Sequence, residues 1–407
     1  MRGTFRSLRN PNYRIWAAGA LVSNIGSWMQ RTAQDWIVLT ELTDRNATAM
    51  GIVMGLQFGP QILLLPLTGF AADHLDRRKV LLCTQAAMGL LALGLGLLVV
   101  TGLVRLWHVY IFAFLLGCAA AFDSPARQVF VSELVDERDL PNAVGLNSTT
   151  FNAARMIGPA IAGLLIAGVG SGWVFLINAV TFLAVLGSLG FLRVHKLKRN
   201  NRAVRTPGSF VEGFRYVLRR TDLKVILFML FLVCTFGFNF SIYISTMAVS
   251  VFHAGAGQYG LLTSIMAAGS VTGALMTAAR AKQGIPVLLA AAIVFGAGCA
   301  AAAMAPSYAL FGAVLFVIGI AAQTLTTSTN SLVQTSTEPA MRGRVIAILL
   351  AIALGGTPIG APIVGWVADR FGPRWAMGVG AAAGLLAAMV GLVYLARLRR
   401  AAPARTV

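Results

Sequence analysis

Long apolar runs constrain the fold of this chain more than any other feature of its sequence. A helix needs about 20 predominantly apolar residues to cross the hydrocarbon core of a bilayer. About twelve runs reach that length, and they are predicted as membrane spans over residues 14–40, 48–72, 80–101, 106–123, 143–168, 173–192, 225–249, 258–279, 285–304, 308–328, 345–368 and 374–396. With 57% hydrophobic and 12% charged residues among 407, the composition also excludes a soluble globular domain.

Polar and apolar residues do not alternate within these runs, which excludes a membrane barrel. The strands of an outer-membrane barrel are about 10 residues long and place apolar and polar side chains in turn. The basic N-terminal stretch MRGTFRSLRNPNYR is not followed by a small-residue cleavage site, so the first span is expected to stay in the mature protein. We therefore predict an all-α polytopic membrane protein.

The formal net charge of +19 is better explained by membrane topology than by nucleic-acid binding. Cytoplasmic segments of membrane proteins retain Lys and Arg. Segment 193–224 carries ten basic residues, and both ends of the chain are basic. The loops that fall on the other side hold only Arg45, Arg105, Arg370 and Arg374. Twelve spans with both termini in the cytoplasm fit this distribution, and no nucleic-acid partner is expected.

The basic segment divides the spans into two sets of six. We predict an N-terminal six-helix bundle over residues 1–192, a cytoplasmic linker over 193–224, and a C-terminal six-helix bundle with a basic tail over 225–407. The two sets match weakly at a shift of 202 residues, through Gly158/Gly360, Ile161/Ile363, Gly163/Gly365, Gly170/Gly372 and Trp173/Trp375. A six-plus-six repeat is one architecture of secondary transporters, which bind substrate between the two repeats and alternate access to it.

Two similar charged stretches interrupt the apolar runs. GFAADHLDRRK covers residues 69–79, and GWVADRFGPRW covers residues 365–375. They lie 296 residues apart, far from the repeat shift of 202, and the predicted topology places them on opposite sides of the membrane. The counterpart of the first stretch in the repeat is ARAKQG at residues 279–284. We interpret the first stretch as a functional loop and the second as a look-alike.

With this loop between its second and third spans, the chain resembles the major facilitator superfamily over essentially its whole length. The resemblance implies a cytoplasmic gating motif in which Gly69 permits close packing of helices and Asp73 latches against the other half. It also implies that Arg77 or Arg78 pairs with an acidic residue near the end of the fourth span, where Asp123 stands in AFDSPAR.

The loop departs from the family pattern at two positions, because Asp76 replaces the usual Gly and His74 the usual basic residue. The strength of the latch is therefore left open. More narrowly, GSWMQRTAQDWIVLTEL at residues 26–42, together with ADHLDRRK and FDSPARQVF, resembles the bacterial subfamily that contains the enterobactin exporter. This resemblance implies export of siderophores or other lipophilic compounds across a bacterial inner membrane, without identifying the substrate.

The fifth span resembles the antiporter motif of the same superfamily, through Gly145, Gly158, Pro159 and Gly163. In the family this pattern implies export coupled to the inward flow of protons. Small residues also allow helices to approach closely, and proline is tolerated in membrane helices. Antiport and helix packing both remain open as explanations of the pattern.

Ionisable residues within membrane spans are costly and usually face a bundle interior or a cavity. Among the fourteen acidic residues, only Asp35 lies well inside a predicted span. Asn24, Trp28, Arg31 and Asp35 share one helical face. We hypothesise that Asp35 couples protons to substrate with Arg31 as its partner. The alternative is a structural Arg31–Asp35 pair that only holds the first helix in place.

The same reasoning gives candidates for the wall of a transport cavity. They are Asn24, Trp28, Asn152, Arg155, Asn239, Tyr243 and Gln323. A polar side chain in a membrane helix is also a common contact between helices, so each candidate has this second interpretation.

The sequence predicts a secondary active transporter, most simply a proton-coupled exporter of amphipathic or lipophilic small molecules. The alternatives are an importer of a nutrient such as a sugar, and a non-transporting membrane sensor. The four histidines and four cysteines lack metal-ligand spacing, and no phosphate-binding loop is present. We therefore expect no enzymatic activity, no cofactor and no metal site. The expected partners are a small-molecule substrate, protons and the lipid bilayer, with a monomer as the functional unit.

Overall fold

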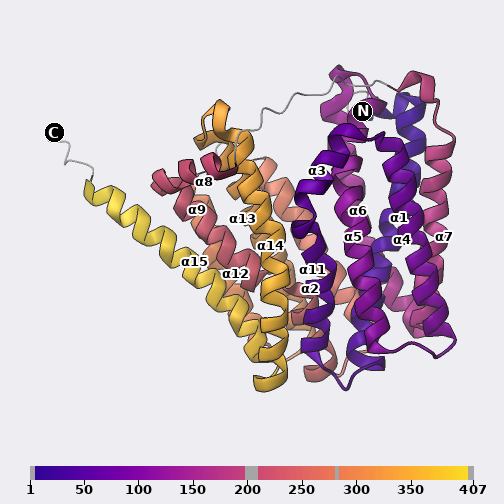
Figure 1. Cartoon of the computed structure of the whole chain (residues 1–407). Helices are drawn as coiled ribbons and strands as arrows, with labels where there is room; N and C mark the ends of the chain where they lie inside the picture. The colour runs from indigo at the N-terminus through magenta and orange to yellow at the C-terminus, as the bar shows by residue number, and fades with distance from the viewer. Residues whose placement is uncertain (1–4, 198–209, 280–283, 402–407) are drawn as a thin grey trace. The chain divides into compact units, whose positions relative to one another are not determined.

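The computed structural model describes residues 5–197, 210–279 and 284–401, and these residues are almost entirely helical. Figure 1 shows helices joined by short connections. Ten of the described helical segments are long and apolar enough to cross a membrane. The prediction of an all-α membrane protein is therefore confirmed, while the arrangement of twelve spans in two bundles stays a prediction.

The described residues form two compact units. Unit 1 contains the chain up to residue 197 together with residues 253–264, and unit 2 contains residues 210–252 and the chain from residue 265 onward. The helices of unit 1 are α1 (Pro11–Trp36), α2 (Ala47–Leu63), α3 (Leu65–His74), α4 (Arg77–Val100), α5 (Leu106–Leu134), α6 (Leu140–Val169), α7 (Ser171–Gly190) and the start of α11 (Ala256–Ala278). The predicted domain boundaries, which assign all of α11 to the second bundle, remain a prediction.

Unit 1 packs α1 against α6 and α7, and α4 against α5 and α7. Small residues permit these contacts. A Cβ atom at Gly19 of α1 would lie 2.6 Å from the hydroxyl oxygen of Ser188 on α7. A buried apolar cluster that includes Trp16, Phe130 and Phe182 fills the interior of the unit.

Two predicted spans of unit 1 differ from the structure. The span at 48–72 is divided into α2 and α3, with Leu64 between them and a proline at the start of α3 that has no N–H to donate. The span at 106–123 continues to Leu134. Among the polar residues that follow its apolar run, Asp123 pairs with Arg127 in the same helix, and Glu133 pairs with Arg77 of α4.

Unit 2 contains α8 (Phe210–Arg219), α9 (Thr221–Leu232), α10 (Phe240–Thr246), the rest of α11, α12 (Ile285–Ala303), α13 (Tyr308–Ser336), α14 (Pro339–Phe371) and α15 (Pro373–Ala401). The predicted span at 225–249 is helical but interrupted. A π-helical turn η5 (Val233–Gly237) follows α9, and α10 begins after Phe238 and Asn239.

Equivalent glycines end the two long helices that the predicted repeat aligns. Gly170 follows α6 with φ 93° and ψ 162°, and Gly372 follows α14 with φ 101° and ψ 162°. Only glycine adopts these angles readily. Both helices therefore stop at the same point of the 202-residue register, and the next helix begins at once.

Candidate functional site

A buried carboxyl group lies near the end of α1. The side chain of Asp35 is 4% exposed, and one of its oxygen atoms accepts a hydrogen bond of 3.2 Å from the hydroxyl of Tyr259 on α11. Tyr259 is itself 1% exposed, and its ring stacks on Trp36 with the centroids 6.2 Å apart. Both partners belong to unit 1, so this unit alone assembles the pair.

Two residues of the predicted antiporter motif, Pro159 and Gly163, lie against the start of α11. A Cβ atom at Gly163 of α6 would lie 2.6 Å from the carbonyl oxygen of Ala256, at the start of α11. In the same way, a Cβ atom at Gly260 would overlap the carbonyl oxygen of Pro159. The motif therefore packs α6 directly against the beginning of α11, one residue away from Tyr259.

The motif also meets α1. A Cβ atom at Gly158 would lie 2.7 Å from the Cβ of Trp28, whereas no atom lies within 4 Å of such an atom at Gly145. Gly158, Pro159 and Gly163 thus take part in close packing in the structure, and Gly145 does not. Proton antiport through this motif remains a prediction.

The guanidinium group of Arg31 lies among aromatic rings. Its central carbon is 4.7 Å from the ring centroid of Trp28 and 5.2 Å from that of Phe58. Such cation–π contacts stabilise a cation where water is scarce. Arg31 also lies within electrostatic range of Asp35 and of the half-buried Arg155 on α6. The structure therefore gathers two cations and one carboxyl group in this part of unit 1.

A second buried carboxyl group lies on α5. Asp123 forms an ion pair of 3.0 Å with Arg127 and accepts hydrogen bonds from Thr84 at 2.9 Å and Gln85 at 2.6 Å. Asn24, a predicted cavity-lining residue, accepts a hydrogen bond of 3.4 Å from Arg127. The ion-pair partner of Asp123 seen here is Arg127, one helical turn away, and its predicted pairing with the arginines of the loop stays a prediction.

The partner of the loop is another acidic residue. Arg77 forms an ion pair of 2.8 Å with Glu133 at the end of α5, and Arg78 donates to the backbone oxygen of Leu189 at 2.8 Å. Glu133 is 5% exposed. Sequence reasoning missed it because the fourth span was ended at Asp123, although the apolar residues around Glu133 at helical spacing could have revealed the longer helix.

The two similar charged stretches differ in structure. In the first, Gly69 and Asp73 lie in α3, and the side chain of Asp73 lies outside the described part of the structure. The chain then leaves the helix, and Asp76 caps α4 by accepting a bond of 3.2 Å from the backbone N–H of Lys79. In the second stretch, α14 stays helical through Asp369 to Phe371. This difference supports separate roles.

The remaining cavity candidates form bonds within their own helices. Asn152 donates to the backbone oxygen of Ser148 at 2.9 Å, and Gln323 donates to the hydroxyl of Thr327 at 3.1 Å. Both are half-buried.

Asn239 and Tyr243 have no exposed surface in the structure. Asn239 donates to the backbone oxygen of Thr235 at 2.8 Å, and Tyr243 donates to that of Phe236. Here they pack around the interrupted helix of unit 2, and their place in the wall of a cavity stays a prediction.

Within the described residues, no group of three His, Cys, Asp or Glu side chains could hold a metal ion. The site therefore consists of buried ionisable groups on membrane helices, which is typical of a transporter. Comparison with known proteins agrees. The chain matches, over residues 2–405, the major facilitator family described as transmembrane secretion effector, and it belongs to this family.

Three relatives are each 25% identical to the chain. The staphyloferrin A transporter of Staphylococcus aureus aligns over 86% of the chain and 87% of its own length. The multidrug efflux pump Tap of Mycolicibacterium fortuitum aligns over 87% and 88%, and the enterobactin exporter of Shigella flexneri over 89% and 87%. The predicted subfamily is therefore confirmed, and the chain is a multi-pass membrane transporter, not an enzyme.

The fold has close counterparts among solved structures. A bacterial homologue of the human lysosomal transporter Spinster superposes with a TM-score of 0.75, over 97% of this chain and 99% of its own. The two sequences are 15% identical, so the likeness concerns the fold alone.

Proposed function

We propose that the chain is a proton-driven exporter of lipophilic or amphipathic small molecules. Its relatives include transporters named for staphyloferrin A and enterobactin, both siderophores, and a multidrug efflux pump. The shared class is a small organic molecule that leaves the cytoplasm. Transport proceeds by alternating access between two six-helix bundles, residues 1–192 and 225–407, in a monomer.

The observation that carries the proton coupling is the bond between Asp35 and Tyr259. Two other buried carboxyl groups, those of Asp123 and Glu133, form ion pairs with Arg127 and Arg77. Asp35 accepts a hydrogen bond from the hydroxyl group of Tyr259 and lies within electrostatic range of Arg31. A carboxyl group in such surroundings can exist with or without its proton, and a change in its distance from Arg31 during the cycle would shift the balance.

The charged loop supplies the gate in this proposal. The Arg77–Glu133 pair fixes the start of α4 to the end of α5, and Asp73 is the proposed latch toward the other half. Because the pair is largely excluded from water, breaking it requires compensation by new contacts in the alternate conformation.

The proposed location is a bacterial inner membrane with both termini in the cytoplasm. Single cysteines at Arg105 and Arg138 in a background without other cysteines test it with an impermeant thiol reagent on intact cells. Labelling at Arg105 and protection at Arg138 are expected. Labelling of Arg138 in intact cells would overturn the orientation and, with it, the cytoplasmic gate.

Transport in everted membrane vesicles tests the function. Everted vesicles with an acidic lumen should accumulate siderophores or lipophilic dyes. Collapse of the proton gradient with an uncoupler should stop this accumulation. Uptake of a sugar by right-side-out vesicles without dye export would favour the importer. Binding without movement of any substrate in either direction would favour the sensor.

A further inference from the structure

The short helix α8 presents large apolar side chains on its surface. Val211, Phe214 and Leu218 are 61%, 50% and 53% exposed. Their spacing of three and four residues places them in one stripe along the helix. Arg215 and Arg219, both exposed, flank this stripe on one side, and the packed residues Gly213 and Val217 flank it on the other.

The orientation of this stripe is fixed by polar contacts at both ends of α8. Near the start of the helix, Glu212 forms an ion pair of 2.8 Å with Arg344 of α14. A Cβ atom at Gly213 would lie 2.8 Å from the Cβ of the same arginine, so the two helices are in close contact there. The stripe is therefore held in place and does not result from a loosely attached segment.

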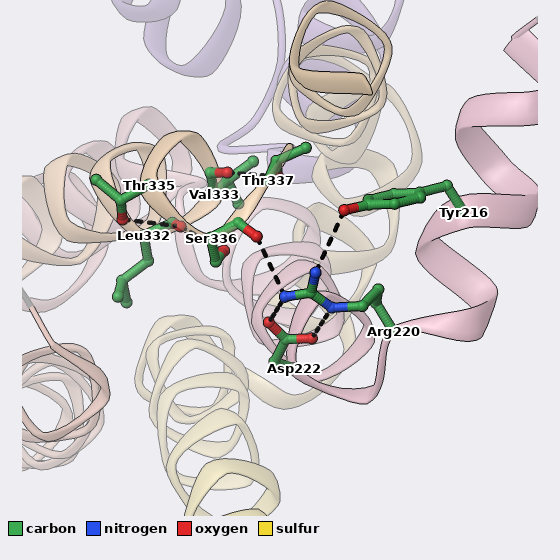
Figure 2. A network of polar contacts seen from close by, with 8 residues as sticks. All are labelled: Tyr216, Arg220, Asp222, Leu332, Val333, Thr335, Ser336 and Thr337. Atoms are coloured by element: carbon green, nitrogen blue, oxygen red, sulfur yellow. Dashed lines mark hydrogen bonds and ion pairs between the residues drawn. The ribbon is translucent and has the colours of Figure 1, made fainter. Parts of the chain in front are cut away.

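Figure 2 shows the second anchor, which lies between α8 and α9. Arg220 donates two hydrogen bonds to Asp222, of 2.9 and 2.6 Å, and one of 3.1 Å to the backbone oxygen of Ser336 at the end of α13. The same guanidinium group donates to the hydroxyl of Tyr216 at 3.3 Å. Arg220 thus ties the last turn of α8 to α9 and α13 within unit 2.

The position of α8 relates the stripe to the membrane. Only Arg220 separates α8 from α9, which begins the candidate membrane span Thr221–Val251. The helix that carries the stripe therefore comes directly before a candidate membrane span. A helix with a broad apolar face and arginines beside it is suited to lie in the membrane interface, with the apolar face in the acyl chains.

We propose that the exposed stripe of α8 docks on the bilayer surface at the start of α9, with Arg215 and Arg219 bound to the phosphate groups of anionic phospholipids. The charge of these arginines is what favours anionic lipids over zwitterionic ones. The Glu212–Arg344 pair links α8, and with it the lipid contact, to α14.

Spin labels on the full-length protein in lipid nanodiscs test the docking. Single labels are placed at Phe214, Leu218 and Arg219, in a background without native cysteines. Collision with oxygen, which is enriched in lipid, should exceed collision with a water-soluble nickel complex at Phe214 and Leu218, with the reverse at Arg219. High nickel accessibility at Phe214 would overturn the proposal, and so would low accessibility to both reagents, since another part of the chain would then cover the stripe.

A second measurement tests the choice of lipid. In nanodiscs with phosphatidylglycerol, the double variant Arg215→Gln/Arg219→Gln should lower the ratio of oxygen to nickel accessibility at Phe214, because the helix loses its two contacts with lipid phosphates. The matched control is Arg105→Gln/Arg370→Gln, which removes two exposed arginines outside α8 and should leave the ratio unchanged. Equal docking of the wild-type protein in phosphatidylcholine alone would contradict the role of anionic lipid.

Discussion

The first helix of unit 1, α1, corresponds to the interrupted segment of α9, η5 and α10 in unit 2. The two make similar backbone contacts but carry different side chains. In unit 1, a Cβ atom at Gly158 of α6 would lie 3.1 Å from the carbonyl oxygen of Ile25 on α1. In unit 2, a Cβ atom at the aligned Gly360 of α14 would overlap the carbonyl oxygen of Thr235 in η5. Ile25 and Thr235 are 210 residues apart.

The same shift of 210 residues relates the ends of the two helices. A π-helical turn covers Ile37–Glu41 after α1, and another covers Met247–Val251 after α10. The repeat that was weak in sequence is therefore visible in the contacts and in the backbone of each unit.

The side chains differ. Unit 1 places Arg31 and Asp35 on this helix, whereas residues 225–251 contain no acidic or basic residue. Two polar side chains of the second helix, Asn239 and Tyr243, donate to backbone oxygens of the same segment. The repeat thus supplies two similar scaffolds, and ionisable chemistry is concentrated on one of them.

Substitution of Asp35 is the strongest way to test this difference. Asp35→Asn should abolish gradient-driven export while substrate binding and energy-independent exchange persist, because the amide cannot take up and release the coupling proton. The matched control is Ser245→Ala, at the equivalent position of unit 2, which should transport nearly as well as the wild type. Measurement is by vesicle transport with and without a proton gradient.

A well-folded Asp35→Asn protein that still pumps against a gradient would end the coupling proposal. The structural alternative predicts poor folding of Asp35→Asn and partial rescue by also neutralising Arg31.

The Arg77–Glu133 pair should give the next largest effect. Arg77→Gln or Glu133→Gln leaves one largely buried charge without its partner, which costs about 3–5 kcal/mol. The thermal midpoint of the purified protein should fall for each single variant and recover partly in the double variant. Asp123→Asn belongs to a separate network with Arg127, so its effect should add to that of Glu133→Gln without rescue. If Asp123→Asn instead rescued the stability of Arg77→Gln, the result would support the Asp123–Arg77 pair that the sequence predicts.

These pairings show why part of the site could not be read from the sequence. An apolar run of about 20 residues predicts a membrane helix because burial of its backbone in lipid leaves few other structures. A buried ion pair violates that pattern, since Glu133 reads as a loop residue until Arg77 is known to neutralise it. The contact of Asp35 with Tyr259 spans 224 residues and lies outside both the repeat and the local motifs.

The interrupted helix of unit 2 was hidden for a different reason. Residues 225–249 are continuously apolar, and the sequence reads as one span. The interruption at Phe238 and Asn239 coincides with the close approach of α14 at Gly360, which is a tertiary effect. The sequence reveals the glycine match between α6 and α14, but it does not reveal which helices these glycines contact.

The shared geometry can itself be tested with glycine substitutions. Gly158→Ala and Gly360→Ala should each destabilise their unit by about 1–3 kcal/mol, because the added methyl group meets a backbone carbonyl that cannot move alone. Gly145→Ala, with no atom within 4 Å of the new methyl group, serves as the control and should be neutral. Thermal unfolding in detergent measures all three. A neutral Gly360→Ala would show that the two units are not equivalent at this contact.

The smallest expected effect distinguishes the two tyrosines that the comparison sets side by side. Tyr259→Phe keeps the ring that stacks on Trp36 and removes only the hydroxyl that donates to Asp35. A hydrogen bond contributes about 1 kcal/mol, so gradient-driven export should fall about fivefold with little change in substrate binding. Tyr243→Phe removes the bond to the backbone oxygen of Phe236 and should lower stability by about 1 kcal/mol without altering the coupling of transport to the gradient.

The ratio of gradient-driven export to energy-independent exchange separates these outcomes, because a general loss of folded protein lowers both rates equally. A lowered ratio for Tyr259→Phe and an unchanged ratio for Tyr243→Phe would place coupling on the α1–α11 contact of unit 1. If both variants lower the ratio, the interrupted helix of unit 2 also takes part in the proton cycle. If neither does, Asp35 acts without Tyr259, and its hydrogen bond serves only to hold α11 against α1.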